Sequence, residues 1–470
     1  MRKITNAYVE KGLIAASAFI EPQDISTGIV KVTVVEGQLE GFEFDKSSQN
    51  SWKVFDKTQI LTAFAHFKNQ PLNLRDVEQG LAQMNRLASK SITLKVFPGT
   101  LMGGSKILLT NGSVKSQARV KTSADNSGQE STGIYNVKLT LEHEDLLGFN
   151  DAWLASYSQS IKENTSPEQS RSFFINLNVP YGYWNFTANF AISNYSTLIY
   201  GTNERIKNSG KGDYQNYRID RSLYRGRNQT FSVGSQISLK KTESFILDVK
   251  NEVGSRNLTV YKGGVQHHLA ASLGFVNTVL TYHKGLGFLN AKQDQEPLNA
   301  FTPRAQFEKV DLSLSYYKPF RLLRNRFYWK SHFGGQYSFD PLYASEQITI
   351  GDPYSVRGFK GKSGFGDRGY YWMNEAAIFL PGFLTEKWSV NSALRKTEFF
   401  SGFDVGFARH FGGVEANQNQ GESFLTGWAA GLRFNGRRLS FDVTYAQSVH
   451  TEDFIGRSSE IYASLNWSIF

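Results

Sequence analysis

Apolar and polar side chains alternate along most of the chain after residue 112. In one stretch every second residue is apolar: Tyr135, Val137, Leu139 and Leu141. Because successive side chains of a strand point to opposite faces, this alternation predicts β-strands with one apolar and one polar face. The pattern predicts about sixteen strands, near residues 116–123, 133–142, 152–161, 170–179, 184–194, 213–222, 228–238, 256–267, 270–282, 307–317, 326–336, 370–380, 398–409, 424–434, 438–446 and 461–470.

Two environments fit such strands: a soluble sandwich with its apolar faces inward, or a membrane barrel with its apolar faces in lipid. The predicted strands reach about ten residues, the length that a tilted strand needs to cross a bilayer, whereas globular strands average about five or six. Short connections such as 181–182 alternate with long ones such as 195–212 and 341–368. The sequence therefore favours an all-β transmembrane barrel of antiparallel strands.

The first 112 residues have a different pattern. Helical spacing predicts one helix over 4–11 and two more between residues 56 and 90, with Asn73 as the N-cap of the last. Strands are predicted at 29–35, 91–97 and 106–110. This region therefore reads as small α+β modules that precede the barrel.

Composition narrows the function classes. The chain has 8 Trp, 22 Tyr and 36 Phe, no cysteine, and a formal net charge of +10. Without cysteine a disulfide-bonded fold, a thiol metal site and a catalytic cysteine are all excluded. No run approaches about 18 consecutive apolar residues, which excludes helical membrane spans. The aromatic content instead fits lipid-facing strands and interfacial girdles.

Motifs for catalysis or ligand chemistry are weak. The run Gly364–Gly369 fits a dinucleotide-binding pattern, but it enters a predicted strand rather than a helix. His267 and His268 are adjacent on a strand and so point to opposite faces, which argues against a shared metal. Lysine and arginine are spread along the chain rather than clustered. We therefore expect no enzyme, no catalytic residue, no metal, no cofactor and no nucleic-acid partner.

Three stretches resemble a known family. Residues 24–28 with 34–37 are similar to the end of that family's first POTRA domain, and residues 71–87, followed by Pro98-Gly99, are similar to its second. Val356-Arg357-Gly358-Phe359 resembles the tip motif of a long loop that folds back into the barrel. The family is the TpsB-type outer-membrane transporters of two-partner secretion, within the POTRA-transporter superfamily, which export filamentous haemagglutinins, haemolysins and contact-dependent toxins.

The resemblance implies a domain order. Residues 1–37 would be the C-terminal part of a first POTRA domain, 38–112 a second POTRA domain, and 113–470 a 16-stranded barrel with loop 341–368 folded inward. It also implies a Gram-negative outer-membrane location with the POTRA domains in the periplasm. Because the family's signal peptide does not precede Met1, we expect this sequence to be N-terminally truncated.

The resemblance further implies a loop lock. Arg357 of the loop motif would reach Asp404 on the barrel wall, and Gly406 beside it would leave room for the loop. A bidentate guanidinium–carboxylate pair would then fix the loop tip. The alternative is that Arg357 is a solvated loop arginine and Asp404 an ordinary lumen charge.

Four charged residues of the predicted helix that follows Asn73 are candidates for client binding: Arg75, Asp76, Glu78 and Arg86. The alternative is that they only form the solvated face of a packed helix. Phe470 resembles a terminal assembly signal, although the apolar residues before it run one position out of phase.

The implied partners are one large exoprotein with an N-terminal secretion domain, outer-membrane lipid or lipopolysaccharide, and the barrel assembly machinery, with the transporter itself a monomer. The runner-up function is a POTRA-type factor that assembles or inserts outer-membrane proteins. A passive porin and an outer-membrane hydrolase are weaker alternatives.

Overall fold

The computed structural model describes residues 1–26, 28–44, 57–65, 70–112, 115–162, 168–200, 204–295, 297–323, 325–380, 397–411, 421–453 and 455–469. The chain divides into two compact units. The first unit comprises Met1–Ala118, Glu142–Trp153 and Leu177–Phe186, and the second comprises Arg119–Leu141, Leu154–Asn176 and Thr187–Phe470. No helix in these described ranges is long and apolar enough to cross a membrane.

The described residues of the first unit form two small sheets and three helices. Its elements are α1 (Arg2–Glu10), β1 (Ser17–Phe19), β2 (Thr33–Val35), β3 (Gln38–Phe44), α2 (Lys57–Ala63), α3 (Leu74–Asn85), β4 (Ile92–Pro98) and β5 (Gly104–Asn111). Strand β1 pairs with β2, and a separate three-stranded sheet has the order β3-β5-β4. Its core joins the sheet to the two later helices through Leu39, Phe64, Val77, Met84 and Ile107.

Helix α3 begins where the sequence predicts. The side chain of Asn73 accepts a hydrogen bond of 2.9 Å from the backbone N–H of Arg75, so the predicted N-cap is confirmed. Asp76 lies in the first turn, where the helix dipole favours a carboxylate. The helix therefore starts with one of its free donors satisfied.

The prediction for residues 29–35 is wrong in part. Only Thr33–Val35 is a strand, and it pairs with β1 rather than with the sheet that contains β4 and β5. The missing strand of that sheet is β3, which runs parallel to β5 with a register shift between Leu39 and Gly41. The shift interrupts the alternation of β3, which is why periodicity did not reveal it.

Gly80 lies where α3 packs on α2, and a Cβ there would approach Cδ1 of Phe64 to 2.2 Å. Gly80→Ala is therefore expected to lower the free energy of unfolding by about 1–3 kcal/mol, although alanine normally favours helix over glycine. The measurement is the urea concentration at which this region of the full chain becomes susceptible to protease. Gly41→Ala, which meets nothing within 4 Å, is the matched control; equal midpoints for the two variants would contradict the packing argument.

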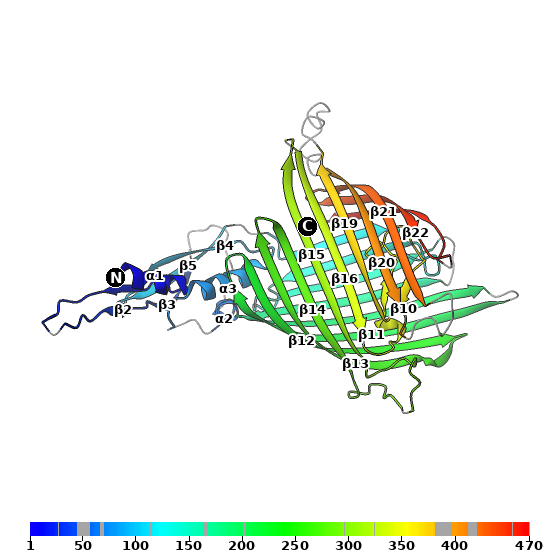
Figure 1. Cartoon of the computed structure of the whole chain (residues 1–470), viewed down its shortest axis with the longest axis horizontal. Coiled ribbons are helices and arrows are strands. Elements are labelled where there is room, and N and C mark those ends of the chain that lie inside the picture. The colour runs from blue at the N-terminus through cyan, green and yellow to red at the C-terminus, as the bar shows by residue number, and fades with distance from the viewer. Residues whose placement is uncertain are drawn as a thin grey trace. The chain divides into compact units, whose positions relative to one another are not determined.

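The barrel is closed and antiparallel, with sixteen strands in the described residues. They are β6 (Ala118–Asp125), β7 (Tyr135–Glu144), β8 (Ala152–Ile161), β9 (Gln169–Tyr181), β10 (Trp184–Tyr200), β11 (Arg205–Arg225), β12 (Gln229–Ile246), β13 (Val249–Ala271), β14 (Gly274–Leu286), β15 (Glu308–Leu322), β16 (Asn325–Ser338), β19 (Arg368–Phe379), β20 (Thr397–Arg409), β21 (Glu422–Asn435), β22 (Leu439–His450) and β23 (Ser459–Ser468). Closure joins β23 to β6, with Ser464 opposite Asp125. Figure 1 shows the tilted strands β15, β16, β19, β20, β21 and β22 side by side in sequence order.

The predicted fold class and strand count are confirmed. The prediction underestimates the strands in the middle of the barrel, since β11 has 21 residues and β13 has 23. The predicted long connection at 195–212 is wrong, because β10 continues to Tyr200 and β11 starts at Arg205. Phe470, the expected assembly signal, lies outside the described residues.

The two faces of the strands match the predicted alternation. Leu139 and Leu141 on β7, like Phe441 and Val443 on β22, leave between 38% and 48% of their surface exposed. Exposed apolar side chains at every second position form a surface that suits lipid better than water. Charged side chains such as Asp404 and Glu375 are instead buried inside the barrel.

Candidate functional site: a loop folded into the barrel

The connection between β16 and β19 forms a hairpin of its own. It contains a short 3-10 helix, η1 (Ala344–Glu346), and two three-residue strands, β17 (Ile348–Ile350) and β18 (Gly364–Gly366). The strands pair antiparallel, with Ile348 opposite Gly366. The turn between them carries the Val356–Phe359 motif and bends at Gly351 and Gly358, which have φ angles of 95° and 97°. A side chain at either glycine would be strained, so the turn depends on these residue types.

Arg357 and Asp404 are brought together by this hairpin. The guanidinium donates from Nε to Oδ2 of Asp404 at 2.6 Å and from Nη2 to Oδ1 at 2.8 Å, and the backbone N–H of Arg357 donates to Oδ2 at 3.1 Å. Asp404 is fully buried and Arg357 is 5% exposed. The carboxylate thus accepts three hydrogen bonds from one residue, which is the bidentate geometry that only arginine offers.

Glycines on the barrel wall make this approach possible. A Cβ at Gly402 would lie 2.4 Å from Nη2 of Arg357, and a Cβ at Gly406 would lie 2.6 Å from Cγ2 of Val356. Gly427 on β21 is closer still, since its Cβ would lie 2.0 Å from the backbone oxygen of Arg357. Sequence reasoning identified Gly406 but missed Gly427, because no motif places β21 beside the loop.

Apolar contacts hold the same turn. Val356 and Phe359 are fully buried and pack in one cluster with Ile350 of the loop and with Ala408 and Leu425 of the wall. Gly358 contributes its backbone oxygen, which accepts a hydrogen bond of 2.5 Å from the Ser458 hydroxyl. All four residues of the predicted motif therefore take part in the contact between the loop and the barrel wall.

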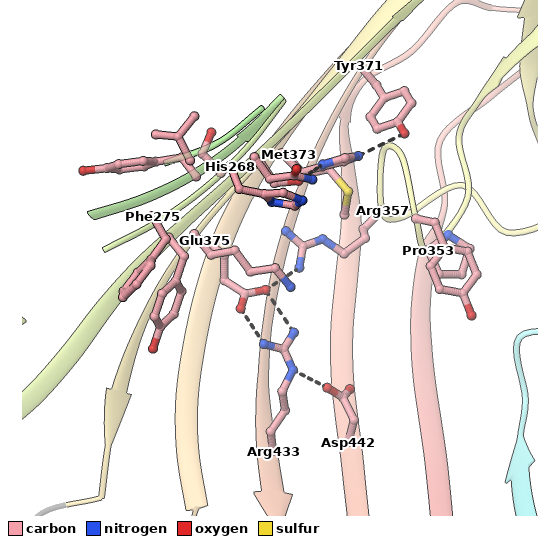
Figure 2. Close-up of a pocket in the computed structure, with 18 of the residues that line it drawn as sticks. His268, Phe275, Pro353, Arg357, Tyr371, Met373, Glu375, Arg433 and Asp442 are labelled. Atoms are coloured by element: carbon pink, nitrogen blue, oxygen red, sulfur yellow. Dashed lines mark hydrogen bonds and ion pairs between the residues drawn. The ribbon is translucent and has the colours of Figure 1, made fainter. Parts of the chain in front are cut away.

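A second arginine, which the sequence reasoning missed, extends the network. Glu375 on β19 accepts from Nη1 of Arg357 at 3.2 Å and from Nη2 of Arg433 at 2.9 Å (Figure 2). Arg433 also donates from Nε to Asp442 at 2.5 Å, and its guanidinium lies 3.7 Å from the centroid of the Phe400 ring. Glu375 is thus shared by two arginines, one on the loop and one on the wall.

These charges line one side of a cavity inside the barrel. The cavity has a volume of about 1330 Å³, and its polar lining includes Lys330, Glu375 and Asp442. Figure 2 shows Arg357 reaching towards Glu375 from the loop while Arg433 and Asp442 come from the wall below. The arrangement can hold the loop by charge, and it leaves a polar space beside the loop that is large enough for many water molecules.

The helix α3 candidates have contacts within the first unit. Asp76 accepts a hydrogen bond of 2.6 Å from the hydroxyl of Tyr183, and Arg86 donates to the backbone oxygen of Asn150 at 2.6 Å. Arg75 and Glu78 lie on the exposed face of the helix. Asp76 and Arg86 thus bind other residues of the unit, and Arg75 and Glu78 are exposed to solvent.

Nearby, Lys90 is buried and forms an ion pair of 2.8 Å with Asp145. Burial lowers the pKa of the Lys90 ammonium, and the neighbouring Asp145 opposes that effect. Among the described residues, no group of three or more His, Cys, Asp or Glu side chains is placed to hold a metal ion.

Comparison with known proteins identifies relatives over the whole chain. The profile of the family "Haemolysin secretion/activation protein ShlB/FhaC/HecB" matches residues 103–434. Profiles of the POTRA domain and of the ShlB-type POTRA domain match residues 38–98 and 1–37. The outer membrane transporter CdiB of Dickeya dadantii is 30% identical over 451 residues, covering 94% of this chain and 75% of that protein.

Solved structures show the same fold. The structure of CdiB from Escherichia coli aligns over 100% of this chain and 83% of that chain, with a TM-score of 0.88 and 24% identity. BamA from Haemophilus ducreyi, in a form that lacks POTRA domains 1–3, aligns over 100% of this chain and 92% of that chain, with a TM-score of 0.55 and 10% identity. The barrel with N-terminal POTRA domains is thus a fold shared with both proteins, and the resemblance to CdiB is much the stronger.

Proposed function

Because the chain belongs to the haemolysin secretion/activation protein family, we propose that it is the outer-membrane pore of a two-partner secretion system. In this proposal it moves one large exoprotein, of the haemagglutinin, haemolysin or contact-dependent toxin class, from the periplasm to the cell surface. Folding of the exoprotein outside the cell then draws the rest of the chain through the pore.

The observation that carries the proposal is the buried pair of Arg357 and Asp404 inside a closed barrel. A passive porin needs an open lumen, whereas here a folded hairpin is fixed in the lumen by three hydrogen bonds from one arginine. We assign Val356, Arg357, Gly358 and Phe359 to this lock, with Asp404 and Gly406 as its partners on the wall. The lock keeps the resting pore narrow and yields when a client enters.

The POTRA domains are the proposed site of client capture. We assign residues 1–37 to the rear part of a first POTRA domain, 38–112 to a second, and 113–470 to the barrel. Strand β4 lies at an edge of its sheet and exposes Val96 and Phe97, so an extended client can add a strand there through main-chain hydrogen bonds. Arg75 and Glu78 on the exposed face of α3 would add charge contacts to the same client.

The remaining partners follow from the surface. In this proposal the barrel lies in the Gram-negative outer membrane as a monomer, with the POTRA domains in the periplasm. The exposed apolar side chains at alternate strand positions support its contact with lipid. The formal charge of +10 favours contact with acidic lipopolysaccharide. Insertion by the barrel assembly machinery completes this scheme, and transport itself needs no cofactor.

The test is export of a candidate exoprotein of the proposed class. The full chain, directed to the periplasm by a signal peptide, is expected to place that exoprotein on the surface of a host that otherwise retains it. The readout is the exoprotein in culture medium and on intact cells, with periplasmic and outer-membrane markers as leakage controls. Export at the same level without the chain would contradict the proposal.

The runner-up function, assembly of other outer-membrane proteins, has one observation in its favour, the alignment with BamA at a TM-score of 0.55. It predicts a different result in the same experiment. Depleting the chain would lower the amounts of unrelated barrels, measured by heat-modifiability of porins, and would leave the exoprotein's export unaffected. The proposed transporter is expected to show the reverse pattern.

A further inference from the structure

A second buried ion cluster lies at the base of the inserted loop, apart from the Arg357 site. Its centre is Glu346, the last residue of η1, which is 4% exposed. Oε1 of Glu346 lies 2.5 Å from Nζ of Lys240 on β12, and Oε2 lies 3.8 Å from Nζ of Lys309 on β15. Lys309 also donates to the backbone oxygen of Glu346 at 2.8 Å. Both the side chain and the backbone of this loop residue are therefore held by wall lysines.

The wall opposite Glu346 is basic because of strand register. One row of side chains on this face begins with Lys262 on β13, which lies opposite His283 on β14. His283 in turn lies opposite Lys309 on β15, so the three side chains point to the same face of the sheet. Asp311, two residues beyond Lys309 on the same face, binds Nε2 of His283 at 2.9 Å. The row thus carries more positive than negative charge, and Glu346 supplies the missing carboxylate.

The two anchors lie on different strands. The tip is held by β19 and β20 through Glu375 and Asp404, whereas Glu346 is held by β12 and β15. Asp367 closes the base of the loop, accepting from the backbone N–H of Leu342 at 2.7 Å and from Nε2 of Gln347 at 3.2 Å. The loop is therefore held both at its tip and at its base. Loss of the contacts at the tip alone would leave the base of the loop in place.

We infer that Glu346 is a second positioning residue of the inserted loop, and that Lys240 and Lys309 are its seat on the barrel wall. This inference rests on the proposed function, in which displacement of the loop opens the pore. Release of the tip breaks only one anchor, and opening requires Glu346 to leave the basic row as well. The uncovered lysines then face the lumen, where their mutual repulsion favours return of the loop carboxylate.

The test uses the absence of native cysteine. Ala408 is fully buried beneath the loop, so Ala408→Cys provides a single thiol that is shielded until the loop lifts. Glu346→Gln in that background is expected to raise the rate of thiol labelling by about tenfold, because removing one partner of a buried ion pair leaves the other charges uncompensated. The same variant is expected to raise the channel conductance of the full chain in planar lipid bilayers.

A double-mutant cycle tests the specific pair. Lys240→Met alone is expected to raise the labelling rate, and Glu346→Gln with Lys240→Met is expected to be no faster than the faster single variant. If the labelling rate of the double variant rose by the product of the two single increases, the two residues would act independently, and the pairing would be overturned. Glu252→Gln removes an exposed ion pair with Lys250 and is the matched control, with no expected change.

Neither readout needs a client, so the two proposals fail separately. Labelling and conductance that stay at the wild-type level in Glu346→Gln would overturn the inference even if the exoprotein is exported normally. If labelling rises in Glu346→Gln but the full chain exports no exoprotein, the result would support Glu346 as a second anchor of the loop and would contradict the proposed function. Heat-modifiability of each variant confirms that the barrel is assembled before either comparison is made.

Discussion

Replacing Arg357 with alanine is expected to leave the barrel assembled and to reduce export of the exoprotein by more than about tenfold. The reason is the fully buried carboxylate of Asp404, which accepts three hydrogen bonds from this one residue. Without the guanidinium two of these bonds are lost, and a charge remains inside the barrel with no cation beside it. The loop tip then loses its fixed position, whereas the backbone pairing of the sixteen strands is unaffected.

The measurement is exoprotein export against the amount of heat-modifiable barrel in the outer membrane. Arg357→Lys is expected to recover little, because an ammonium cannot make the bidentate contact with Asp404. Arg437→Ala, in the exposed turn between β21 and β22, is the matched arginine control and is expected to export normally. Normal export by Arg357→Ala would remove the lock from the proposed mechanism.

The barrel could be predicted from sequence because each strand carries its own signal. Alternation over about ten residues is a local property, and it located β7 and β22 within a few residues of their ends. The same logic failed where pairing extends beyond the alternating stretch, as at the start of β11, where residues 205–212 are mostly polar and include two glycines, so that they resemble a loop. Pairing with β12 holds residues 208–212 in the barrel wall, and a pattern within one segment of sequence does not reveal such pairing.

The site could be predicted only where a motif names its residues. Arg357 and Asp404 were found because both lie in recognisable short runs, although they are 47 residues apart. Arg433 and Glu346 were missed because they have no such run, and their partners Glu375 and Lys240 lie far from them along the chain. The sequence shows only that Arg433 lies on the polar, lumen-facing side of its strand, and many other residues of the barrel share that property.

Gly427→Val is expected to expel the loop tip and so to cause the same loss of export as that expected for Arg357→Ala, while leaving every charge in place. A Cβ at Gly427 would lie 2.0 Å from the backbone oxygen of Arg357 and 3.5 Å from Cγ1 of Val356. The first of these is a backbone atom, so no side-chain rotation relieves the overlap and the turn must move away from β21. Valine itself suits a strand, which limits the damage to the loop.

The measurements are export and the rate of thiol labelling at Ala408→Cys, which is fully buried while the loop is seated. Labelling is expected to rise by about tenfold or more, since overlap with the backbone also separates the Arg357–Asp404 pair. Gly263→Val on β13 is the matched control, because the three atoms nearest to a Cβ there all belong to the movable side chain of Tyr261, the closest at 3.1 Å. If Gly427→Val exported and labelled like this control, the loop would have another seat within the barrel, and the wall glycines would lose their assigned part in holding it.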